Sequence, residues 1–157
     1  KLVQSLAILE YLEETRPNPS ILPSTPADRA HARALGQVVA MEAHTLLVPR
    51  IRKYLEHELG LDEETRMTWI RHWNDTASDA LEAMLAADPR TGKFCVGDTP
   101  TVADICLVPH IAATIVLYNN DISRYPNIER IFNTCMELDA FSSTHPLKQP
   151  DAAPGEH

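Results

Sequence analysis

One stretch decides the fold of this chain: Gly97-Asp-Thr-Pro-Thr-Val-Ala-Asp-Ile-Cys-Leu-Val-Pro109. It opens an almost wholly apolar helix that is expected to run to Tyr118. Thr101 and Asp104 have the spacing of a capping box, with Asp as the reciprocal acceptor, so the helix is expected to begin there. Because a helix that is apolar on all sides lies at the centre of a bundle, the stretch predicts a helical domain built around it.

The N-terminal third predicts two helical regions separated by a proline-rich connector. From Ser5 to Glu14, leucines and an isoleucine recur at helical spacing, and the Ser5 hydroxyl is expected to cap this helix. Prolines then punctuate residues 16–26, and since each removes a backbone donor, this segment is expected to be an extended connector. A long helical region is expected from about Ala27 to His57, with a kink near Pro49.

The C-terminal half predicts further helices around the apolar one. Gly60 is expected to end the kinked region, and Asp62, followed by two glutamates, to start the next helix. The strongest amphipathic pattern of the chain lies in that helix, at Ile70, Trp73, Ala77, Leu81, Met84 and Leu85. A later helix is expected over about 127–138, and a short one near 140–144. Since no segment alternates with period two, the sequence predicts an all-α bundle of five to seven helices.

Composition excludes several classes of function. The 157 residues carry a net charge of −8 and contain no block of Lys and Arg, so no nucleic-acid partner is expected. The longest apolar stretch, Ile105 to Tyr118, is shorter than a membrane span and contains Pro109, so no membrane partner is expected. Three scattered cysteines are typical of reduced thiols in the cytoplasm. The chain begins with Lys1 rather than Met, and we expect it to be part of a longer protein.

No motif for self-contained catalysis is present. HExxH, the GxSxG nucleophile elbow and a phosphate-binding glycine loop are all absent from the sequence, and no metal site is expected. Two places remain as candidate sites. Gln4 and Ser5 begin a helix, where free backbone N–H groups and a hydroxyl suit a carboxylate, although composition alone favours a plain helix cap. His44 and Arg50 flank the expected kink, where Arg50 is suited to bind a carboxylate or simply to face water.

The order of these segments and their amino-acid sequences resemble those of the zeta-class glutathione transferases, the family of maleylacetoacetate and maleylpyruvate isomerases. The Thr-x-x-Asp box is widespread among glutathione transferases and indicates only the superfamily. The matching segments are Gln4-Ser-Leu-Ala-Ile-Leu-Glu-Tyr-Leu-Glu-Glu14, Gly97 to Pro109, Asp121-Ile-Ser-Arg-Tyr-Pro126 and His145-Pro-Leu-Lys-Gln-Pro-Asp151.

The resemblance implies a glutathione transferase C-terminal helical bundle that follows a thioredoxin-like domain missing from this sequence. Residues 1–15 are then expected to be the last helix of that domain, 16–26 the linker and 27–157 the helical C-terminal domain. The family's catalytic Ser-Ser-Cys motif is absent, so no catalytic residue is expected in this chain. The implied cofactor is glutathione, with Gln4 and Ser5 at its γ-glutamyl end, His44 near it, and Arg50 on the substrate.

The implied activity is a cis–trans isomerisation of a conjugated keto-acid, in which the glutathione thiolate adds to a double bond and is eliminated after rotation. The implied partners are a small-molecule electrophile and a second copy of the chain in a homodimer. Two departures from the family weaken anion binding. Leu47-Val48 replaces a polar pair, and Ala113-Thr-Ile-Val-Leu117 lacks an expected Arg. The alternatives are a transferase for apolar electrophiles, or a non-catalytic helical interaction domain.

Overall fold

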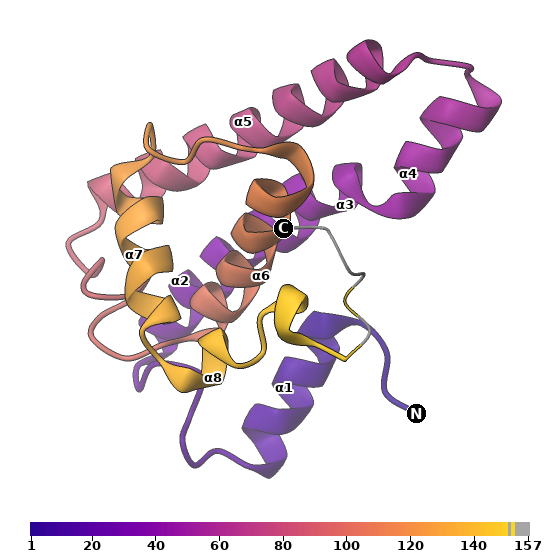
Figure 1. The fold of residues 1–157 in the computed structure, drawn as a ribbon. Helices are drawn as coiled ribbons and strands as arrows, with labels where there is room; N and C mark the ends of the chain where they lie inside the picture. The colour runs from indigo at the N-terminus through magenta and orange to yellow at the C-terminus, as the bar shows by residue number, and fades with distance from the viewer. Residues whose placement is uncertain (151, 153–157) are drawn as a thin grey trace.

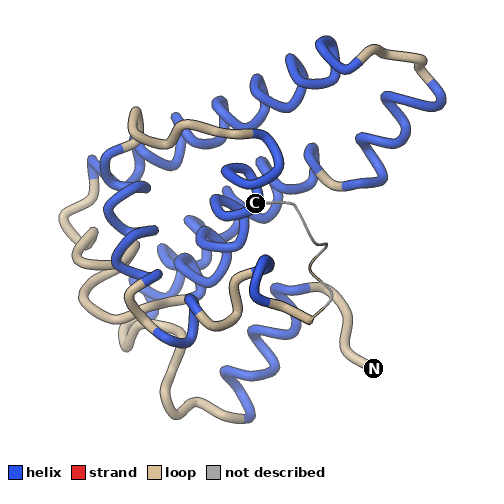
Figure 2. Tube along the Cα trace, in the orientation of Figure 1, coloured by secondary structure: helices blue, strands red, loops and turns tan. Residues whose placement is uncertain are grey.

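The structure is a computed structural model that describes residues 1–150 and 152. This part of the chain contains helices and loops but no strand, which confirms the all-α prediction (Figure 2). The helical elements in chain order are α1 (Ser5–Thr15), α2 (Pro26–Gln37), η1 (Val38–Ala43), α3 (His44–Leu47), α4 (Pro49–Lys53), η2 (Tyr54–Glu58), α5 (Glu63–Ala87), α6 (Val102–Tyr118), α7 (Pro126–Met136), α8 (Asp139–Ser142) and η3 (Pro146–Lys148).

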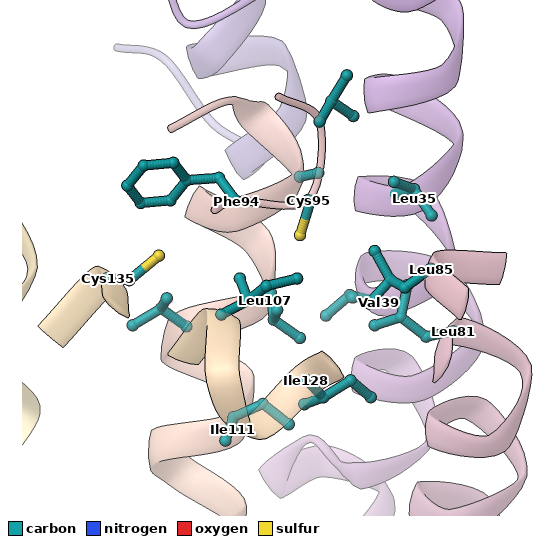
Figure 3. Packing of buried hydrophobic residues seen from close by; sticks show 14 of the residues in the cluster. Leu35, Val39, Leu81, Leu85, Phe94, Cys95, Leu107, Ile111, Ile128 and Cys135 are labelled. Atoms are coloured by element: carbon teal, nitrogen blue, oxygen red, sulfur yellow. The ribbon is translucent and has the colours of Figure 1, made fainter. Parts of the chain in front are cut away.

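Helix α6 lies at the centre of the bundle, as its apolar sequence predicts (Figure 1). It packs against α2, η1 and α7, while α5 packs against η1 and α7 and closes the far side. The core between these helices is apolar (Figure 3). Its most deeply buried side chains include Leu35, Val39, Leu81, Leu85, Leu107, Ile111, Ile128 and Cys135.

The boundaries of α5 and α6 follow from their capping residues. The Asp62 side chain accepts a hydrogen bond from the Thr65 N–H and starts α5 at the expected place. The predicted box of Thr101 and Asp104 is confirmed, since the Thr101 hydroxyl accepts the Ala103 N–H and the Asp104 carboxylate accepts the N–H of the cap residue Thr101. Helix α6 ends at Asn119, which adopts the left-handed conformation with φ 49°.

The long helical region before α5 is less regular than its sequence predicts. Two segments, η1 and η2, are π-helical, which the apolar pattern does not reveal. At Val48 the backbone turns extended with ψ 154°, so Pro49 starts a new helix instead of only kinking an existing one. The region ends near Gly60, which has a φ of +62° as expected of a helix-terminating glycine.

Helix α1 lies at the edge of the bundle and is held to it by carboxylates (Figure 1). Glu10 forms a two-point ion pair with Arg33 of α2, with oxygen–nitrogen distances of 2.7 and 3.0 Å. Glu13 is buried and accepts hydrogen bonds from the Ser20 hydroxyl, the Ile21 N–H and the Arg29 guanidinium. These contacts fix the direction in which the N-terminal turn of α1 points.

The C-terminal elements begin slightly earlier than predicted. Helix α7 starts at Pro126, because proline is well suited to the first turn of a helix, and the short helix α8 starts at Asp139. Beyond α8, Pro146–Lys148 form the 3-10 turn η3. Asp151, at the end of the family-like terminal segment, and residues 153–157 lie outside the described residues.

Candidate functional site

A cavity of about 430 Å³ lies between α1, η1, α3 and α6. It brings together Ser5, from the first turn of α1, and His44, the first residue of α3. These are two of the four site residues that the sequence predicts. The remaining lining residues are Ile8, Leu9, Val39, Ala40, Ile105, Cys106, Pro109 and His110. We refer to this space as the site cavity.

Ser5 reaches the site cavity as the first residue of α1, and not as its cap. The cap position belongs to Gln4, which has a φ of 71°, and no side chain accepts a backbone N–H there. The prediction that the Ser5 hydroxyl caps the helix is therefore wrong. The N–H groups of the first turn lack a side-chain partner, and no acidic residue lies in that turn. An anion is favoured at such an end by the helix dipole.

His44 comes to the cavity because η1 ends immediately before it. The wide turn of the π-helix shifts the register of the residues that follow, and π-helical turns recur at functional sites. The His44 ring stands edge to face against that of His110, with ring centroids 6.3 Å apart and an interplanar angle of 82°. Burial, and to a lesser extent the charge of His44, lower the pKa of His110 to about 4, so His110 is neutral at pH 7.

Arg50 and Gln4 are not among the residues that line the site cavity. Arg50 lies in α4, beyond the break at Val48, and its side chain is exposed. The hypothesis that the kink brings His44 and Arg50 to one cleft is therefore not supported by the lining of this cavity. Gln4 is exposed beside the cavity entrance residue Ser5.

The two departures in sequence take different places. Leu47 is buried in the bundle, so its side chain faces the core rather than a ligand. The segment 113–117 belongs to the last turns of α6, and none of its residues lines the site cavity. The walls of the cavity are formed by apolar side chains and Pro109, and among its lining residues only Ser5, His44, Cys106 and His110 carry polar or thiol groups.

His110 is the lining residue that sequence reasoning missed. It lies within the apolar run of α6, directly after Pro109, and a polar ring at a core position was the available signal. Cys106 also lines the cavity, but burial raises the pKa of its thiol to about 11. A thiol that stays protonated at pH 7 is a poor nucleophile, so Cys106 does not replace a catalytic cysteine.

A second, larger cavity of about 680 Å³ lies on the other side of Ile105 and Pro109. It is bordered by the connector residues 19–21, by α6, and by the segment from Met136 to Pro146. None of the four predicted site residues lines it.

In the described part of the chain, no cluster of three or more His, Cys, Asp or Glu side chains is arranged to hold a metal ion. Among the same residues, no helix combines the length and hydropathy that a bilayer-spanning segment needs.

Comparisons with known proteins agree with this fold. Residues 75–133 match the family described as the glutathione S-transferase C-terminal domain. A maleylpyruvate isomerase from Ralstonia sp. is 41% identical over 152 residues, which cover 97% of this chain and 71% of that relative.

Two solved structures have the same arrangement of helices. One is the holo structure of a maleylpyruvate isomerase described as a bacterial zeta-class glutathione S-transferase, with a TM-score of 0.93 and 41% identity over 97% of this chain and 71% of that one. The other is a maleylacetoacetate isomerase from Methylobacterium extorquens AM1 with bound malonate and glutathione, with a TM-score of 0.92, 42% identity and the same coverage of each chain. The chain therefore belongs to the zeta-class glutathione S-transferase family, that of the maleylacetoacetate and maleylpyruvate isomerases.

Proposed function

We propose that these residues form the helical part of a glutathione-dependent cis–trans isomerase acting on conjugated keto-acids of the maleylacetoacetate type. One observation carries the proposal: the fold brings Ser5 and His44, far apart in sequence, to a single cavity beside an uncapped helix N-terminus. The relatives' names and the glutathione bound in one similar structure support it.

In this proposal the complete enzyme also contains a thioredoxin-like domain. Residues 1–15 form the last helix of that domain, and residues 16–26 link it to the helical domain. The greater length of the Ralstonia relative, of which the matched part covers 71%, is consistent with a further domain. The side chains of four apolar residues on and before α1 are exposed and form a surface suited to packing against a further domain: Leu2, Val3, Tyr11 and Leu12. The Ser-Ser-Cys motif that activates the thiol is proposed to lie in that domain.

The residues of the site cavity fit a glutathione molecule at its carboxylate end. The γ-glutamyl carboxylate would accept hydrogen bonds from the Ser5 hydroxyl and from the free N–H groups of α1, with the Gln4 amide beside them. His44 would donate a further hydrogen bond from the opposite wall. Glutathione supplies a thiolate that adds to the substrate double bond and leaves after rotation. We assign Arg50 to the substrate carboxylate, outside the cavity proper.

A second candidate activity is the conjugation of glutathione to uncharged, apolar electrophiles. Its support is the apolar wall of the site cavity, in which none of the lining residues is a Lys or Arg. The two activities differ in the charge of the preferred substrate. Comparable turnover of maleylacetone and a neutral aryl halide would favour the second activity, and a strong preference for maleylacetone would exclude it.

The experiment that tests the main proposal is an isomerase assay of the complete protein with maleylacetone, with and without glutathione. We expect isomerisation that requires glutathione. No isomerisation at any glutathione concentration would contradict the proposal.

We further propose a cytoplasmic homodimer, which size-exclusion chromatography with light scattering would reveal as twice the mass of one chain.

A further inference from the structure

His110 is a buried polar residue with an unexplained nitrogen. Its side chain is 7% exposed, and its Nε2 atom is buried without any hydrogen-bond partner. Leaving such a group unpaired costs about 1–3 kcal/mol, so an apolar residue would serve the core better at this position. Packing in the core alone therefore does not explain why an imidazole lies at this position.

The position of the ring indicates that role. His110 lies at the boundary between the site cavity and a void of about 10 Å³ lined by residues of η1, α5 and α6. Apart from His110 itself, only Ser78 contributes a polar side chain to the void. One side of the ring thus faces the core, while the other side meets the ring of the exposed residue His44 edge to face.

We propose that His110 is a positioning residue, which holds the His44 imidazole toward the site cavity so that His44 can bind glutathione. The inference rests on the proposed function. His44 lies at the surface, at the start of the four-residue helix α3, and its ring contacts that of His110. A planar, uncharged ring behind it restricts the rotamers of His44 and does not repel it. Ordering the ring in advance lowers the entropy cost of binding the cofactor.

The test is a double-mutant cycle on the complete enzyme, with the KM for glutathione as the readout. We expect His110→Ala to raise this KM about tenfold, with a smaller change in kcat. In a His44→Ala background, the same substitution should have almost no further effect. Because a purely structural defect would act equally in both backgrounds, additive effects would overturn the proposal.

Three further variants sharpen the result. His110→Phe keeps a planar ring behind His44 and should retain a KM close to that of the wild type. His110→Gln removes the ring but keeps polarity, and it serves as the test where His110→Ala does not fold. Thr114→Val changes another buried polar residue of α6, outside the cavity, and should leave the KM unchanged.

The outcomes separate the two proposals. An enzyme without glutathione-dependent activity would contradict the proposed function itself. An active enzyme in which neither His110→Ala nor His110→Gln changes the KM would overturn the positioning role alone.

Discussion

The Oδ1 atom of Asp104 accepts a hydrogen bond from the backbone N–H of Cys95 at 2.8 Å. The other carboxylate oxygen accepts from the N–H and the hydroxyl of Thr101, at 2.7 and 3.0 Å. Asp104 is completely buried, so one carboxylate satisfies donors from both the start of α6 and the loop before it. This arrangement joins the cap of the central helix to the loop that enters the core.

Replacing Asp104 should therefore destabilise the whole domain. Asp104→Ala leaves two buried N–H groups unpaired, and we expect a loss on the order of 4 kcal/mol in the free energy of unfolding, measured with urea at pH 7. The matched control is Asp98→Ala, which removes an exposed carboxylate bonded only to the Lys93 N–H and should cost less than about 1 kcal/mol. Equal losses in the two variants would contradict this account of the cap.

Acid should weaken the domain through His110. Burial lowers the pKa of this residue from 6.5 to about 4, so between these values the unfolded chain binds a proton that the folded chain does not. Stability is therefore fully present above pH 6.5 and falls as the pH is lowered toward 4, by on the order of 3 kcal/mol. Urea titrations of wild type and His110→Gln between pH 4 and 7 should show a smaller pH dependence in the variant. Parallel curves would show that His110 is not the group responsible.

The attachment of α1 should depend on Glu13. Burial raises the pKa of this carboxyl, but hydrogen bonds from Ser20, Ile21 and Arg29 outweigh it, so the pKa is lowered overall. Its contribution to stability is present above the unfolded pKa near 4.5 and is lost as the pH falls through the folded value. Glu13→Gln should weaken the docking of α1 by roughly 1–2 kcal/mol. Hydrogen exchange would report faster exchange of α1 amides, with α6 amides unaffected as the internal control.

The 157 residues alone should not bind glutathione usefully. In the proposed enzyme the thioredoxin-like domain supplies most contacts to the tripeptide, and these residues contribute chiefly Ser5 and His44. A purified chain whose mass is 17.5 kDa should pass through immobilised glutathione unretained. Its retention would mean that the helical domain carries a complete cofactor site by itself.

Most of the fold could be predicted because its signals are local. The capping box at Thr101 and Asp104, the stop at Asn119 and the cap at Asp62 each depend on residues within one helical turn. The π-helical segments η1 and η2 could not be predicted, since their apolar pattern does not differ from that of an ordinary α-helix and both pack against helix α5. The full break at Val48 was likewise predicted only as a kink.

The site was only partly accessible from sequence. That Ser5 and His44 share a cavity depends on how α1 docks, which is decided by the ion pairs of Glu10 and Glu13 with α2. No spacing rule connects residues on separate helices in this way. His110 is a polar residue within an apolar helix, and its contact with the His44 ring is seen only in the structure.

The most direct test of the central claim is the glutathione dependence of maleylacetone isomerisation in the complete wild-type protein and in Ser5→Ala. If Ser5 binds the γ-glutamyl carboxylate, its loss removes a hydrogen bond to a charged group, and the KM for glutathione should rise about tenfold or more. At saturating glutathione, kcat should change little. Isomerisation that needs no glutathione, or a KM for glutathione that is the same in both proteins, would contradict the account.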